Sequence, residues 1–145
     1  MPENYETRIM GLDFGKIRIG IAISDSLKMF AIAHKTILNN SVAFSELEKI
    51  VKDKNVIKFI LGIPNEERQK KDSKTSVINE VKKFKAILEK RFGLDVELWD
   101  ETYTSVIAQQ RILESVNKKI KRQNKALLDM YSAAIILKEY LDSVN

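Results

Sequence analysis

The chain has 145 residues, of which 44% are hydrophobic and 31% charged, as is usual for a globular domain, and its net charge is +5. It contains no cysteine and one histidine, His34, which excludes disulfides and thiolate metal sites and leaves carboxylates to carry polar chemistry. The basic excess favours an anionic partner, nucleic acid first. No apolar run reaches membrane length and no secretion signal is evident, so we expect one cytoplasmic domain over residues 1–145 with no membrane partner.

Two segments near the N-terminus, 7–14 and 17–24, alternate between apolar and small or polar residues, as β-strands do. Gly15 and Lys16 separate them, which predicts a tight hairpin and antiparallel pairing. A third short strand at 30–37 extends this meander.

Helical and strand-like patterns alternate over the rest of the chain. In chain order they predict a helix at 42–54, a strand at 56–64, a helix at 75–92, a strand at 95–99, and helices at 104–115 and 124–141. Strands that alternate with helices imply parallel additions to a sheet. The predicted fold class is α/β, with a mixed five-stranded sheet in which an antiparallel meander is followed by parallel strands, and with helices on both faces.

Three acids occupy unusual positions in this pattern. Asp13 lies near the end of an otherwise apolar strand, where a carboxylate must be paired, hydrogen-bonded or bound to a cation to offset its desolvation. Glu101 follows the strand 95–99, at the start of a predicted helix. Asp129 lies in the last helix on a face of small residues that includes Ala126, Ser132 and Ala133. A separate apolar stripe is formed by Leu127, Met130, Ala134, Leu137 and Leu141.

Each acid also has a simpler explanation. Asp13 would bond backbone amides of the hairpin in an Asx turn, Glu101 would stabilise a helix N-terminus, and Asp129 would face solvent. Oxygen ligands of this kind are nevertheless what Mg²⁺ or Mn²⁺ prefers, and such ions hydrolyse phosphodiesters without histidine or cysteine. We therefore predict that the three acids converge at one edge of the sheet.

Four motifs stand out in chain order: GLDFGKIRIGIAISD, LGIP, WDETYTSVIA and LLDMYSAAIILKEYL. Together they resemble the YqgF family of bacterial pre-16S rRNA nucleases, also described as Holliday junction resolvases, over essentially the whole chain. The resemblance implies a ribonuclease H-like fold and cleavage of nucleic acid with Mg²⁺ or Mn²⁺. It assigns the catalytic and metal-binding roles to Asp13, Glu101 and Asp129, and we expect supporting roles for Gly15 and Thr104.

The chain departs from the family pattern at two places. Thr102 stands where the family has arginine in Asp-Glu-Arg-Leu-Thr-Thr, and NEERQKKD stands where it has Asn-Met-Asp-Gly. Both departures spare the three acids and concern substrate contacts. They also support an alternative, a nucleic-acid-binding protein of the same fold with weak or no catalysis.

The segment 117–125, NKKIKRQNK, contains basic residues and no acid. A run of this kind is often only a solvated loop, but its end lies four residues before Asp129, which favours contact with phosphates. Tyr103 would either stack on an unpaired base or pack within its helix. The predicted nucleic-acid-binding residues are Arg18, Lys118, Lys119, Lys121, Arg122 and Lys125.

The resulting prediction is a metal-dependent endonuclease that processes the 5′ end of pre-16S rRNA, with structured RNA and ribosomal precursor particles as partners. Cleavage of branched DNA by a Holliday junction resolvase is the alternative within the same chemistry. An ATPase or sugar kinase of the actin-like class, suggested by Asp-Phe-Gly before a hairpin, needs two lobes and is too large for 145 residues. We expect a monomer or a weak homodimer.

Overall fold

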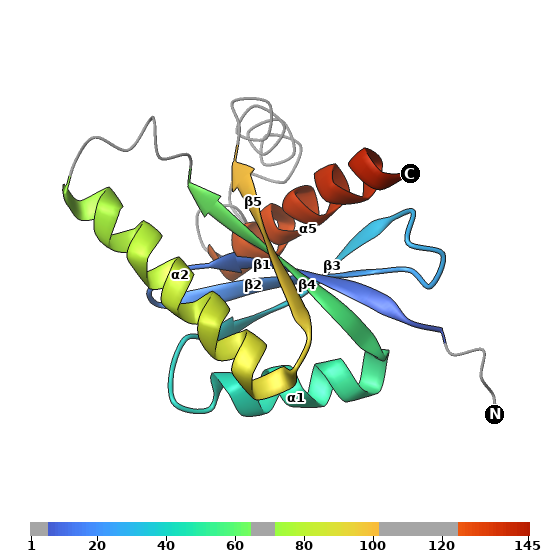
Figure 1. The fold of residues 1–145 in the computed structure, drawn as a ribbon, viewed down its shortest axis with the longest axis horizontal. Helices are drawn as coiled ribbons and strands as arrows, with labels where there is room; N and C mark the ends of the chain where they lie inside the picture. Colours follow the sequence, from blue (N-terminus) through green and yellow to red (C-terminus); the bar gives the residue numbers. More distant parts are fainter. Residues whose placement is uncertain (1–5, 65–71, 102–124) are drawn as a thin grey trace.

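The computed structural model describes residues 6–64, 72–101 and 125–145. Its centre is a five-stranded sheet in the order β3-β2-β1-β4-β5 (Figure 1). The strands are β1 (Arg8–Phe14), β2 (Arg18–Ser24), β3 (Ala31–Leu38), β4 (Val56–Pro64) and β5 (Asp95–Glu101). The pairs β1–β2 and β2–β3 are antiparallel, whereas β4 pairs in parallel with β1 and with β5. The mixed sheet predicted from the alternation pattern is confirmed.

Three described helices cover the two faces of this sheet (Figure 1). Helices α1 (Ala43–Lys54) and α2 (Asp72–Phe92) pack over one face, and α5 (Lys125–Val144) packs over the other. Helix α2 begins three residues before its predicted start and α5 continues three residues past its predicted end. The helix predicted at 104–115 lies outside the described residues. No helix in the described part of the chain is long and apolar enough to cross a membrane.

Strand alternation sorts the apolar residues of β1 between two cores. Met10 and Leu12 point to the core beneath α1 and α2, whereas Ile9 lies in the core beneath α5. Ile17 is an exception to the predicted pattern, because β2 begins only at Arg18 and the Ile17 side chain is 68% exposed. This sorting places Gly11 and Asp13, which alternate with Leu12, on the face that α5 covers.

Helix α5 lies very close to the sheet because glycines face it. A Cβ atom on Gly20 would lie 2.0 Å from the Asp129 carbonyl oxygen, and one on Gly11 would lie 2.7 Å from the Leu137 Cβ. Real Cβ atoms do not approach other atoms this closely, so only glycine fits at these two positions with the helix where it is.

This close packing corrects the predicted apolar stripe of α5. Ala133, assigned from the sequence to the small-residue face of Asp129, is fully buried against the sheet. The stripe omitted Ile136 and Tyr140, which are buried in the same core, and included Met130, which is only partly buried. Because the glycines leave room for it, the small-residue face of α5 packs against the sheet. The helix face that carries Asp129 is therefore next to the face that is buried.

Candidate active site

The carboxyl ends of β1, β4 and β5 meet at one edge of the sheet, because these three strands are parallel. Leu12 of β1 pairs with Leu61 of β4, which pairs with Leu98 of β5. The residues that follow, Asp13, Gly62 and Trp99, therefore share the face covered by α5. Two acids, one on β1 and one on β5, are expected from the sequence at this edge.

Glu101 is the last residue of β5, two positions after Trp99, and its backbone pairs with Pro64 of β4. Strand alternation puts position 101 on the α5 face, at the same edge as Asp13. The Glu101 side chain lies outside the described part of the structure.

Gly20 connects Asp13 to Asp129. In the antiparallel pair β1–β2, Asp13 is the direct partner of Gly20. The backbone of Asp129 rests on the same glycine, since its carbonyl oxygen lies where a Gly20 Cβ would be. Asp13 and Asp129, which are 116 positions apart in sequence, are thus both neighbours of Gly20, one within the sheet and the other on the helix above it. Both acids are partly buried.

Asp129 is held by Arg18, which lies on β2 two residues before Gly20. The Arg18 Nε donates a hydrogen bond of 2.7 Å to the Asp129 Oδ2 atom. The side chains are 30% and 26% exposed, so water screens this ion pair less than a pair on the open surface. In the structure the Asp129 carboxylate is turned toward the sheet and paired with Arg18. This differs from the simpler explanation in which Asp129 faces solvent. Arg18 was expected from the sequence to bind nucleic acid.

The donor atoms at this edge fit a hard divalent cation. Asp13 and Asp129 offer carboxylate oxygens, the ligands that Mg²⁺ and Mn²⁺ prefer. The positively charged guanidinium of Arg18 already neutralises the Asp129 carboxylate. In the ranges the structure describes, no three acidic or histidine side chains gather into a metal-binding group, and Glu101 would have to supply the third carboxylate.

His34 lies on the edge strand β3, which carries none of the three acids. Although the residue is exposed, partial desolvation of the imidazole lowers its pKa, and the nearby charges of Lys54 and Lys35 act in the same direction. The imidazole is therefore neutral at pH 7.

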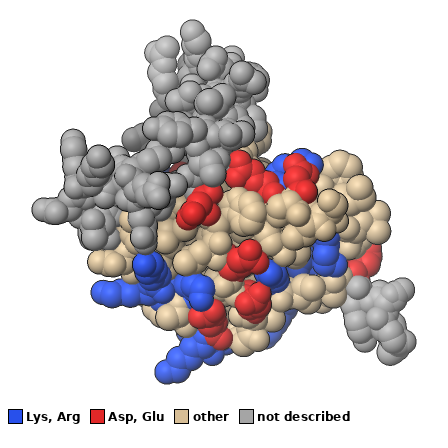
Figure 2. Space-filling view, turned by 45° about the horizontal axis from the view of Figure 1, so that its top comes forward, with Lys and Arg blue, Asp and Glu red and all other residues tan. Residues whose placement is uncertain are grey.

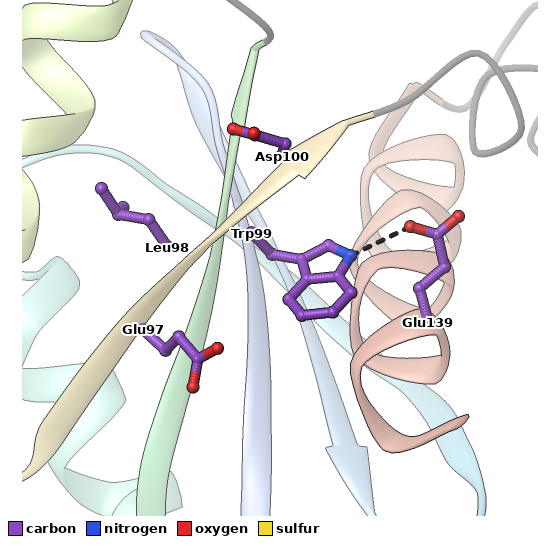
Figure 3. Close-up of a pocket in the computed structure, with 5 residues that line it drawn as sticks. All are labelled: Glu97, Leu98, Trp99, Asp100 and Glu139. Carbon is purple, nitrogen blue, oxygen red and sulfur yellow. Dashed lines mark hydrogen bonds between the residues drawn. The ribbon is translucent and has the colours of Figure 1, made fainter. Parts of the chain in front are cut away.

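A hollow of about 490 Å³ opens beside β5, next to this edge (Figure 3). The Trp99 indole points toward α5 and donates a hydrogen bond of 3.0 Å to Glu139, while Asp100 points to the other side of the strand (Figure 3). Glu97, also in the lining, accepts a hydrogen bond from Lys58, and this bond raises the pKa of Lys58. The acidic lining does not suit a phosphate group, so we do not place the nucleic-acid backbone in this hollow.

The other predicted site residues are only partly described. Gly15 lies in the turn after β1, where its carbonyl oxygen accepts a hydrogen bond from the Asn39 side chain. Lys125 is the first residue of α5, and its side chain is not described. The remaining predicted residues lie outside the described ranges, namely Thr104, Lys118, Lys119, Lys121 and Arg122.

Sequence reasoning missed Gly20 and the pairing of Arg18 with Asp129. A signal for the first was present, because Gly11, Asp13 and Gly20 all fall on one face of the hairpin and strand glycines often mark a close backbone approach. No local signal announces the ion pair, because its partners are 111 residues apart.

Known proteins of one family resemble this chain over nearly its whole length. A family model described as RuvX, Holliday junction resolvase, matches residues 7–143. A protein of Azobacteroides pseudotrichonymphae named "Putative pre-16S rRNA nuclease" is 39% identical over 136 residues, covering 93% of this chain and 96% of the relative. Proteins of the same name from Bacteroides thetaiotaomicron and Clostridioides difficile are 38% and 37% identical, over 94% and 93% of this chain and 97% and 94% of theirs.

The fold also resembles a solved structure, that of T. thermophilus RuvC in complex with a Holliday junction substrate. The TM-score is 0.59 at 10% identity, with 95% of each chain covered, which confirms the ribonuclease H-like fold. The match of the family model and the nearly full-length relatives confirm the family that the four motifs resemble. The chain therefore belongs to the RuvX family, also known as YqgF, and is a nuclease of that family.

Proposed function

We propose that this nuclease cleaves phosphodiester bonds in the precursor of 16S rRNA, and that Asp13, Glu101 and Asp129 hold Mg²⁺ or Mn²⁺ at its active site. One observation carries the site: Asp13 and Asp129 flank Gly20 on a single face of the sheet, at the edge where β5 ends with Glu101. The names of the relatives support the substrate. With this substrate, the protein acts in the cytoplasm and meets ribosomal precursor particles.

The chain's own groups have distinct tasks in this proposal. The carboxylates of Asp13, Glu101 and Asp129 provide the oxygen ligands, and Arg18 fixes the Asp129 carboxylate before the ligand set is complete. A divalent cation bound by these acids supplies Lewis-acid stabilisation of the phosphodiester and lowers the pKa of the attacking water. Gly20 determines how close the helix carries Asp129 to the strand that bears Asp13.

A four-way DNA junction is the second candidate substrate, because the description of the matching family names Holliday junctions. The two substrates share the phosphodiester chemistry and differ in what must be recognised around it. Substrate choice therefore has to be measured on both nucleic acids with the same enzyme preparation.

The assay uses the full chain, freed of metal with EDTA, on labelled RNA that spans the 5′ end of 16S rRNA and its precursor extension, and on a four-way DNA junction. We expect a defined RNA product with Mg²⁺ or Mn²⁺, none in EDTA, and at least about 10³-fold slower cleavage by Asp129→Asn, because several kcal/mol of charge stabilisation are lost. Cleavage of the junction but not of the RNA would select the second substrate. Binding of both without cleavage would show a non-catalytic protein.

The same RNA tests the basic segment. Figure 2 shows acidic and basic side chains intermixed on the described surface of the face in view, so that surface offers no uniform path for a phosphate backbone. We propose that the segment 117–125 supplies this path. Replacing Lys118, Lys119 and Lys121 by Ala should flatten the plot of log affinity against log salt by about 0.7 to 0.9 per lost phosphate contact. An unchanged slope would move the path to another surface.

A further inference from the structure

We infer that Arg18 is a positioning residue for Asp129, and that its guanidinium serves as the counter-cation of this carboxylate until a divalent cation displaces it. The inference rests on the proposed function, because it assumes that Asp129 is a ligand of that cation. It goes beyond the proposal in stating that the metal and an internal side chain compete for the same carboxylate.

The geometry of the bond carries the first step. At 2.7 Å, the Arg18 Nε to Asp129 Oδ2 contact is a short, charge-assisted hydrogen bond. It joins the interior of a sheet to a helix, because Arg18 lies on β2, which pairs with strands on both sides, and Asp129 lies in the second turn of α5. The carboxylate is therefore held by a rigid element and not by a neighbour on its own helix.

Two contacts from one strand fix Asp129 at both of its ends. The backbone of Asp129 packs directly against Gly20. Arg18, on the same face two residues earlier, donates a hydrogen bond to the Asp129 carboxylate. The Thr36 hydroxyl of β3 also donates a hydrogen bond to the carbonyl of Ala126, one turn earlier in α5. The start of α5 is thus tied to β2 and β3, and contacts within the chain itself orient the Asp129 carboxylate.

The charges predict that Arg18 and a divalent cation compete for the Asp129 carboxylate. A divalent cation bound to Asp129 would lie within a few ångströms of the guanidinium, in a partly buried place where like charges repel more strongly than in bulk water. The two cations would share the negative charge of one carboxylate and repel each other, so we expect the divalent cation to displace Arg18 from the Oδ2 atom of Asp129. A guanidinium has five N–H donors, and the bond to Asp129 uses one, so the displaced Arg18 can turn to an anionic phosphate.

The test measures Mn²⁺ binding and not activity. The full-length chain, treated with EDTA and desalted, is titrated with Mn²⁺ while free Mn²⁺ is followed by electron paramagnetic resonance, and its Tm is measured with and without saturating Mn²⁺. The variant is Arg18→Met, which keeps much of the side-chain volume and removes the charge. Arg8→Met is the matched control. Arg8 begins β1, at the end of the strand opposite to Asp13, and it donates hydrogen bonds to the carbonyls of Glu6 and Lys54.

Arg18→Met should bind Mn²⁺ about tenfold more tightly than the parent, because a nearby positive charge is gone. Without metal its Tm should be lower by about 2 to 6 °C, and saturating Mn²⁺ should remove most of this difference. Arg8→Met, with the same change of net charge, should bind Mn²⁺ like the parent. A purely structural Arg18 would instead lower the Tm equally with and without Mn²⁺.

Unchanged or weaker Mn²⁺ binding by Arg18→Met overturns the inference. Asp129→Asn separates this result from a failure of the proposed function. If Asp129→Asn loses Mn²⁺ binding while Arg18→Met binds like the parent, Asp129 remains a ligand and only the competition is wrong. If Asp129→Asn binds Mn²⁺ as tightly as the parent, both the metal site and the role of Arg18 are overturned.

Discussion

Asp13→Asn should lower Mg²⁺-dependent cleavage by at least about 10³-fold while the protein stays folded. The amide keeps the size of the carboxylate and removes its charge, so the site loses a ligand together with several kcal/mol of charge stabilisation. The free energy of unfolding should change by less than about 1 kcal/mol or rise slightly, because removing one of several neighbouring negative charges relieves repulsion in the metal-free protein. Single-turnover cleavage and thermal unfolding measure the two effects separately.

Asp100→Asn is the matched control for this variant. Asp100 precedes Glu101 and lies at the same edge of the sheet, but it pairs with Ile63 and points to the opposite face of β5, where it is exposed (Figure 3). Its substitution should leave cleavage within about twofold of the parent. Equal losses in the two variants would mean that general negative charge at this edge, and not a ligand on the α5 face, supports the reaction.

Gly20→Ala should be the most damaging single-methyl change near the site. Its Cβ would lie 2.0 Å from the Asp129 carbonyl oxygen and 2.9 Å from the Met130 nitrogen, and backbone atoms cannot rotate away. Helix α5 must move off the sheet, which should cost about 2 to 3 kcal/mol of unfolding free energy. A displacement of about 1 Å in Asp129 should also reduce cleavage by about 10²-fold at temperatures where the protein is folded.

Gly11→Ala distinguishes loss of stability from loss of position. Its Cβ would also press on α5, at 2.7 Å from the Leu137 Cβ and 2.9 Å from the Ala133 carbonyl oxygen. These contacts lie one to two turns beyond Asp129, so this variant should lose stability but keep much more activity than Gly20→Ala. If the two variants lose activity in proportion to their loss of stability, Gly20 has no special role in placing Asp129.

The layout of the sheet could be predicted because its signals are local. Alternation over 7–14 and 17–24 marks β1 and β2, and the link between them, residues 15–17 in the structure, is too short for anything but a hairpin. The helical spacing over 42–54 and 75–92 marks α1 and α2 for the same reason. Each of these patterns is complete within one element.

The seating of α5 could not be predicted, because it depends on what the sheet presents to the helix. Viewed alone, α5 is apolar around much of its surface, so several rotations would bury a similar area. Gly11 and Gly20 select the rotation that buries Ala133 and places Asp129 over β2. The bond from Arg18 to Asp129 follows from this choice and is visible only when both elements are in place.

The most direct test of a shared metal site is a crystal structure of the full chain with Mn²⁺, with the metal located by its anomalous scattering. We predict an Mn²⁺ peak at the carboxyl ends of β1 and β5, with carboxylate oxygens of Asp13, Glu101 and Asp129 within about 2.3 Å of the ion or of one of a close pair of ions. The Arg18 guanidinium should then have left Asp129. A structure in which Mn²⁺ binds elsewhere while Asp129 keeps its bond to Arg18, or in which Glu101 lies away from the other two acids, would contradict the shared site.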